Sequence, residues 1–118
     1  MCKIYKYEVT RYELVLNGGK KRPPGEPWPA TLGLYGNAGQ IAEVLFHADL
    51  STMPEEDTTP SEGDDANKFV KTNFLMSDYE KVVSLVASGR PVYCGHTRTP
   101  PQVWITNDPK NLTTTPGP

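Results

Sequence analysis

An amphipathic helix with both ends marked, residues 77–88, constrains the fold of this chain more than any other segment. Its apolar residues recur at i, i+3, i+4 and i+7, a spacing that places on one helix face Tyr79, Val82, Val83 and Val86. Ser77 and Glu80 have the spacing of a capping box, in which each side chain bonds the backbone N–H of the other residue. Gly89 and Pro91 then end the helix. We therefore expect one helix that packs a single face against a neighbouring layer.

Runs of β-branched and aromatic residues predict strands on both sides of this helix. The expected strands cover residues 3–16, 31–36, 40–47, 91–96 and 102–106, and residues 69–75 fit either a short strand or an extended lead-in to the helix. The first range is too long for one regular strand, so we expect a bulge or bend near Thr10-Arg11. Asn37-Ala38-Gly39 has the composition of a tight hairpin turn. In the last strand, Trp104 and Ile105 are candidates for the core.

These elements predict an α+β fold, a mainly antiparallel sheet of about five or six strands with one principal helix at about 77–88 packed on it. The 118 residues are enough for one domain, which we expect to span 1–107. Residues 49–65 contain seven acidic and no basic residues, so 49–67 is expected to be a mobile acidic loop. Residues 108–118 are expected to be a flexible tail.

Charge and hydropathy narrow the classes of function. A net charge of −2 argues against nucleic-acid or anionic-membrane binding, because both need a surplus of basic residues. The N-terminal residues lack the apolar core of a secretory signal, and two cysteines do not make a disulfide framework. The expected location is therefore the cytoplasm. Mimicry of a nucleic acid by residues 49–65 is a further alternative, but it would need those carboxylates to be held in a rigid array.

The candidate chemistry centres on Cys94 and His96, which lie two residues apart in an expected strand and can share a face. They are the catalytic residues of the alternative hypothesis, a small thiol-dependent enzyme. The metal-dependent version of that hypothesis adds His47 to the two, with Asp49 as a further candidate ligand. None of these spacings is diagnostic of a triad or of a zinc site. We therefore expect neither a cofactor nor a metal.

Basic and aromatic residues suggest a ligand-binding surface instead. Three cations follow Gly18-Gly19, whose backbone N–H groups could cradle an anion: Lys20, Lys21 and Arg22. Arg90 and Arg98 bracket the strand that contains Cys94 and could join them. Trp28 and Tyr35 are aromatic residues that fit either the core or a binding surface.

The leading hypothesis is a small, soluble, non-catalytic binding or interaction protein that recognises a partner protein or a small anionic ligand. It is expected to be a homodimer, because one helix covers only one face of a sheet and a second copy is the commonest cover for the other.

Overall fold

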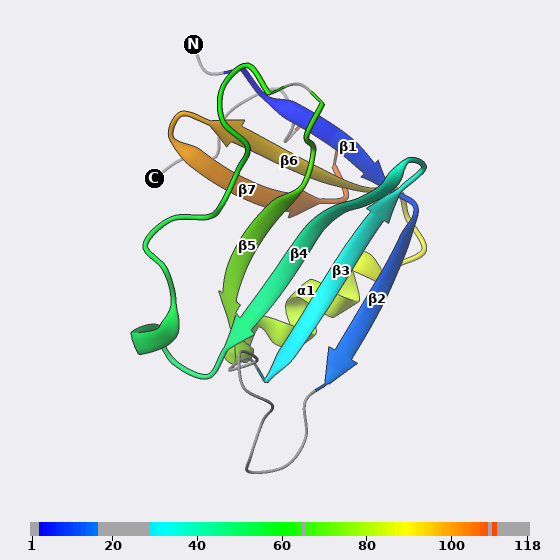
Figure 1. Cartoon of the computed structure of the whole chain (residues 1–118). Coiled ribbons are helices and arrows are strands. Elements are labelled where there is room, and N and C mark those ends of the chain that lie inside the picture. Colours follow the sequence, from blue (N-terminus) through cyan, green and yellow to red (C-terminus); the bar gives the residue numbers. More distant parts are fainter. Residues whose placement is uncertain (1–2, 17–28, 65, 109, 111–118) are drawn as a thin grey trace.

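The computed structural model describes residues 3–16, 29–64, 66–108 and 110. Four of the expected ligand-binding residues lie outside the described residues, namely Lys20, Lys21, Arg22 and Trp28, as does nearly all of the expected tail. The described residues form an α+β fold with one α-helix and seven strands (Figure 1). No helix in the described part of the chain has the length and apolar character needed to cross a bilayer.

The strands are divided between two sheets. The larger has the order β2(Arg11–Leu16), β3(Ala30–Gly36), β4(Gly39–His47), β5(Val70–Leu75). The smaller has the order β1(Tyr5–Val9), β6(Val92–Arg98), β7(Pro101–Thr106). All neighbours are antiparallel except β4 and β5, which are parallel. The α+β class and the mainly antiparallel pairing are confirmed, whereas the single sheet of five or six strands is matched only roughly, because the strands form two sheets of three and four.

Thr10 is the point at which the chain passes from one sheet to the other. Its backbone N–H and its hydroxyl both donate to the carbonyl oxygen of Tyr35, at 2.8 and 3.2 Å. Residues before it pair with β6, and residues after it pair with β3. The predicted interruption near Thr10-Arg11 is confirmed. Its consequence is larger than a bulge, because it turns one long strand into β1 and β2 in different sheets.

The hairpin β3–β4 forms where the sequence predicts it. Gly36 pairs with Gly39, so Asn37 and Ala38 make the turn, and Gly39 has a φ of 127° that favours glycine. In β4 both faces are largely buried, since Ala42, Val44 and Phe46 alternate with residues that are buried or, at Glu43, half-buried. This agrees with a continuous apolar run in a central strand.

Helix α1(Tyr79–Val86) is shorter than the expected 77–88 and follows the 3₁₀ turn η2(Met76–Asp78). The predicted capping box is not formed, because Ser77 lies inside that turn and the N-cap of α1 is Asp78, whose side chain makes no capping hydrogen bond. An N-cap needs extended backbone, which occurs here one turn earlier, at Leu75. The helix ends at Val86 with Ala87 as its C-cap, two residues before the predicted end, and Gly89 follows with a φ of +80°.

The helix packs on one face of the four-stranded sheet, called the helix face below (Figure 1). Val82 and Val86 are buried in the core, and the ring of Tyr79 meets that of Phe46 edge-on at 5.2 Å. Ile105 packs against this core as predicted. Trp104 is only half-buried and lies outside the core cluster, since neighbouring residues of a strand face opposite sides.

Residues 48–69 connect the parallel strands β4 and β5, and Asp57 fixes the middle of this connection. Its carboxylate accepts from the Thr72 hydroxyl at 3.0 Å and the Asn73 backbone N–H at 3.3 Å, both in β5. It also accepts from the Val103 backbone N–H in β7 at 3.0 Å. One side chain therefore joins the edges of the two sheets. Burial raises the pKa of Asp57, although these hydrogen bonds act in the opposite direction.

Candidate functional site

Cys94 and His96 share one face of β6, opposite Tyr7 and Tyr5 of β1. Cys94 is 1% exposed, and burial, aided by the Asp57 charge, raises the pKa of its thiol to about 12. His96 is fully buried, and burial together with Arg98 lowers its pKa to about 4. At neutral pH both side chains are therefore uncharged. A nucleophilic cysteine needs the reverse, a low thiol pKa beside a basic or cationic partner.

The hydrogen bonds of His96 indicate a structural residue. Its Nε2 accepts from Nε of Arg98 at 3.3 Å, so the neutral ring carries its proton on Nδ1. That Nδ1 has no hydrogen-bond partner among the described residues. The ring stacks on Tyr5 with centroids 4.9 Å apart and an interplanar angle of 9°. These contacts do not hold the imidazole as a base toward Cys94.

The candidate metal ligands of the alternative hypothesis are not brought together. His47 belongs to the four-stranded sheet, where Nδ1 contacts the Thr52 hydroxyl at 3.0 Å and Nε2 contacts the Asn73 Oδ1 at 2.8 Å. Cys94 and His96 belong to the other sheet. Asp49 caps a short 3₁₀ turn by accepting from the backbone N–H of Ser51. Within the described ranges, no group of three His, Cys, Asp or Glu residues could hold a metal ion.

Arg98 is buried and binds backbone carbonyl groups of its own chain rather than a ligand. It is 6% exposed, and its guanidinium donates to three backbone carbonyl oxygens of the acidic segment, those of Ser61, Asp64 and Asn67, at 3.0–3.1 Å. With the bond to His96, these contacts use four of the five N–H donors of an arginine. The guanidinium also lies 3.9 Å from the ring centroid of Tyr5. The mobility expected for residues 49–67 stays a prediction, but Arg98 and Asp57 both anchor that segment.

Arg90 is exposed and lies at the other end of β6 from Arg98. The seven residues of that strand separate them by about 20 Å, so they cannot bind one small anion together. Arg90 lines a hollow of 480 Å³ between the end of α1 and the start of β2, where Tyr12 and Val86 also contribute. The expected basic patch is thus reduced, among the described residues, to Arg90.

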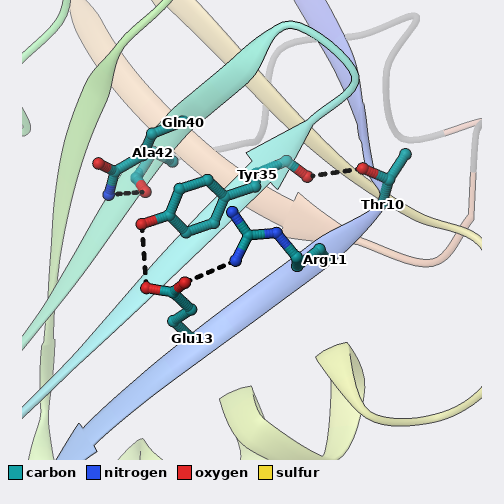
Figure 2. Close-up of polar contacts among 6 residues, drawn as sticks. All are labelled: Thr10, Arg11, Glu13, Tyr35, Gln40 and Ala42. Carbon is teal, nitrogen blue, oxygen red and sulfur yellow. Dashed lines mark hydrogen bonds and ion pairs between the residues drawn. The ribbon is translucent and has the colours of Figure 1, made fainter.

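Tyr35 is part of a polar cluster on the face of the sheet opposite α1, called the outer face (Figure 2). Its hydroxyl donates to Oε2 of Glu13 at 3.2 Å, and Glu13 pairs with Arg11, whose guanidinium lies 4.0 Å from the Tyr35 ring centroid. Hydrogen bonds from Arg11 and Tyr35 lower the pKa of Glu13. Partial desolvation, then the bond to Glu13, raises the pKa of Tyr35.

The ring of Tyr35 lies across Gly33, which pairs with Glu13 in the neighbouring strand. A Cβ atom at Gly33 would approach that ring to 3.1 Å. Glycine at this position therefore lets the ring lie flat and reach Glu13. Arg11 and Glu13 were not among the predicted site residues. Their i, i+2 spacing places them on one strand face, but the sequence does not show that Tyr35 joins them there.

β2 is the end strand of its sheet, and in the described part of the chain no strand pairs with its other edge. Three large apolar side chains on it are well exposed: Tyr12 at 40%, Val15 at 51% and Leu16 at 64%. The opposite end strand, β5, is partly covered, because Thr58 forms a bridge with Lys71 and Asp57 bonds its backbone. β2 therefore offers both backbone hydrogen-bonding groups and apolar surface.

Comparisons with protein-family models, with curated proteins and with solved structures find no match to this chain. Among the described residues, fold and geometry therefore point to one candidate binding site, the outer edge of β2 next to the Arg11–Glu13 ion pair.

Proposed function

We propose that this chain is a non-catalytic binding protein that recognises another polypeptide by strand addition at the β2 edge. The observation that carries this proposal is the exposure of Tyr12, Val15 and Leu16 on an end strand whose outer edge pairs with no other described strand. An added strand gains main-chain hydrogen bonds along such an edge, while alternate side chains provide specificity.

The composition of β2 supports this proposal. Edge strands that avoid pairing commonly carry lysine, proline, a bulge or an inward-pointing charge. Residues 11–16 contain neither lysine nor proline, and their two charges, Arg11 and Glu13, pair with each other. We infer that this edge is kept available for a partner. Homodimerisation and a cytoplasmic location remain parts of the same proposal, the second in keeping with Cys94 as a buried free thiol.

The alternative enzyme centred on Cys94 and His96 receives no support from the geometry, because both groups are buried and uncharged at neutral pH. A small anionic ligand is the second candidate, favoured by the hollow beside Arg90. Calorimetric titration with inorganic phosphate would detect it, and Arg90→Gln should abolish the heat of binding. Phosphate binding that survives this substitution would exclude the hollow as the anion site.

Selection of peptides from a random display library tests the main proposal. We expect extended peptides that bind the wild-type protein and lose at least tenfold in affinity for Val15→Glu/Leu16→Glu, because carboxylates on the edge oppose strand addition. Leu50→Glu is the matched control, since Leu50 is 72% exposed and lies outside the sheet. Failure to select any peptide, or equal binding to the β2 variant, would overturn the proposal.

A further inference from the structure

The occupant of the β2 edge can be argued from the sequence and exposure of the strand itself. We propose that a second copy of this chain fills it, with the two β2 strands antiparallel about a two-fold axis and Leu14 opposite Leu14 of the second copy. This inference rests on the β2 edge being the recognition surface of the proposed function.

The two faces of β2 differ in character. Leu14 packs against the core and Tyr12 lines the hollow beside Val86 of α1, so the even-numbered residues 12, 14 and 16 belong to the helix face. Arg11 and Glu13 contact Tyr35 on the outer face (Figure 2). A two-fold axis through an antiparallel pair keeps each face together, so residues of like parity lie opposite one another in the dimer.

The number of β2 residues that can pair between the two copies leaves two possible registers. Pairing within residues 11–16 of both copies spans five residues only if the axis passes at Glu13 or at Leu14. An axis at Tyr12 would have to recruit β1, which already pairs with β6. An axis at Val15 is excluded because it would pair only three residues of each β2 strand.

Charge and burial decide between the two remaining registers. An axis at Glu13 places two carboxylates directly opposite each other, an arrangement that destabilises a strand pair. An axis at Leu14 instead places Tyr12 opposite Leu16 and Glu13 opposite Val15. The apolar side chains of Tyr12 and Leu16, which are 40% and 64% exposed, then cover each other. The burial of Tyr12 against Leu16 therefore stabilises the Leu14 register by more than any ion pair between exposed side chains could stabilise the Glu13 register.

The resulting dimer would join the two four-stranded sheets into one continuous sheet with both α1 helices on the same face. A single edge strand buries less area than a standard protein interface, so we expect dissociation at about micromolar concentration. Subunits would then exchange freely, which allows two variants to be mixed and compared.

Disulfide cross-linking between variants tests the register. Opposite residues of an antiparallel pair have Cα atoms about 4.5–5.5 Å apart, a separation that a disulfide can bridge. In a Cys2→Ser background, a mixture of Tyr12→Cys and Leu16→Cys proteins should cross-link under mild oxidation at least fivefold faster than either alone. Leu50→Cys provides the rate of random collision, and Cys94 is buried at 1% exposure.

Each outcome bears on a different part of the reasoning. Fast self-linking of Tyr12→Cys, or of Glu13→Cys or Val15→Cys, would overturn the Leu14 register. A mixture that links no faster than Leu50→Cys would overturn the second copy as occupant. If peptides still bind at β2 in that case, the proposed function stands and only this inference falls. If peptides also fail to bind, both fall.

Discussion

His96 should make the stability of this protein depend on pH between about 6.5 and 4. The side chain is fully buried, stacks on Tyr5 and accepts a hydrogen bond from Arg98. Burial, followed by the charge of Arg98, lowers its pKa from 6.5 to about 4. Because the folded state binds this proton more weakly than the unfolded chain, the unfolding free energy falls as the pH drops through that window.

The size of the effect follows from the pKa displacement. Each pKa unit corresponds to about 1.4 kcal/mol, so a change from 6.5 to about 4 removes about 3 kcal/mol by pH 4. Roughly 2 kcal/mol of this should already be lost at pH 5. Asp57 acts with the opposite sign, because its pKa is raised and the folded state binds its proton more tightly. The wild-type curve alone would mix the two contributions, so a variant is needed.

Urea unfolding of wild type and His96→Gln at pH 7, 6, 5 and 4 isolates the histidine. Glutamine keeps an acceptor for Arg98 at a position similar to Nε2 but does not titrate. Wild type should lose about 3 kcal/mol more than the variant between pH 7 and pH 4. Parallel curves, or an NMR titration of the folded His96 ring with a midpoint near 6.5, would refute the reasoning.

The remaining predictions concern the anchors of the acidic segment and the buried thiol. Asp57→Ala should lower the free energy of unfolding in urea by about 3 kcal/mol, because three hydrogen bonds are lost. The control Glu56→Ala, at an exposed residue, should leave it nearly unchanged, and equal losses would contradict the role of Asp57. Arg98→Lys should speed amide exchange in residues 61–67 at least tenfold, because lysine cannot reach three carbonyls together, and Arg90→Lys should not. In the Cys2→Ser protein, Cys94 should not react with iodoacetamide at pH 8 until urea unfolds the chain. Rapid labelling of the folded protein would contradict a buried, unreactive thiol.

Local features of this fold could be predicted from the sequence because neighbouring residues determine them. The apolar stripe of α1 follows from spacing alone, and the turn at Asn37-Ala38 is set by the residues that form it. The capping box failed for an equally local reason, since a 3₁₀ turn begins ahead of the helix and takes up Ser77. Sequence spacing does not reveal that extra turn.

The division into two sheets depends on contacts between distant residues. It is fixed where Thr10 bonds Tyr35 and where Asp57 joins β5 to β7, and none of these partners is adjacent in sequence. The sequence suggests Arg98 as a ligand-binding residue because it brackets, with Arg90, the strand that contains Cys94. Its actual partners are backbone carbonyls, which any residue can offer, so no residue pattern indicates them. An edge strand can have the same alternation of side chains as a central strand. The sequence therefore did not reveal that β2 lies at the edge of its sheet.

Sedimentation equilibrium of the wild type beside two substitutions of Val15 tests the central claim most directly. Wild type should rise from 13.1 kDa toward twice that mass as its concentration increases through the micromolar range. Val15→Glu should remain at 13.1 kDa because it places a carboxylate opposite Glu13 of the second copy, whereas Val15→Lys should still associate. A wild-type mass of 13.1 kDa at every concentration, or equal association of the two variants, would contradict pairing through β2 in this register.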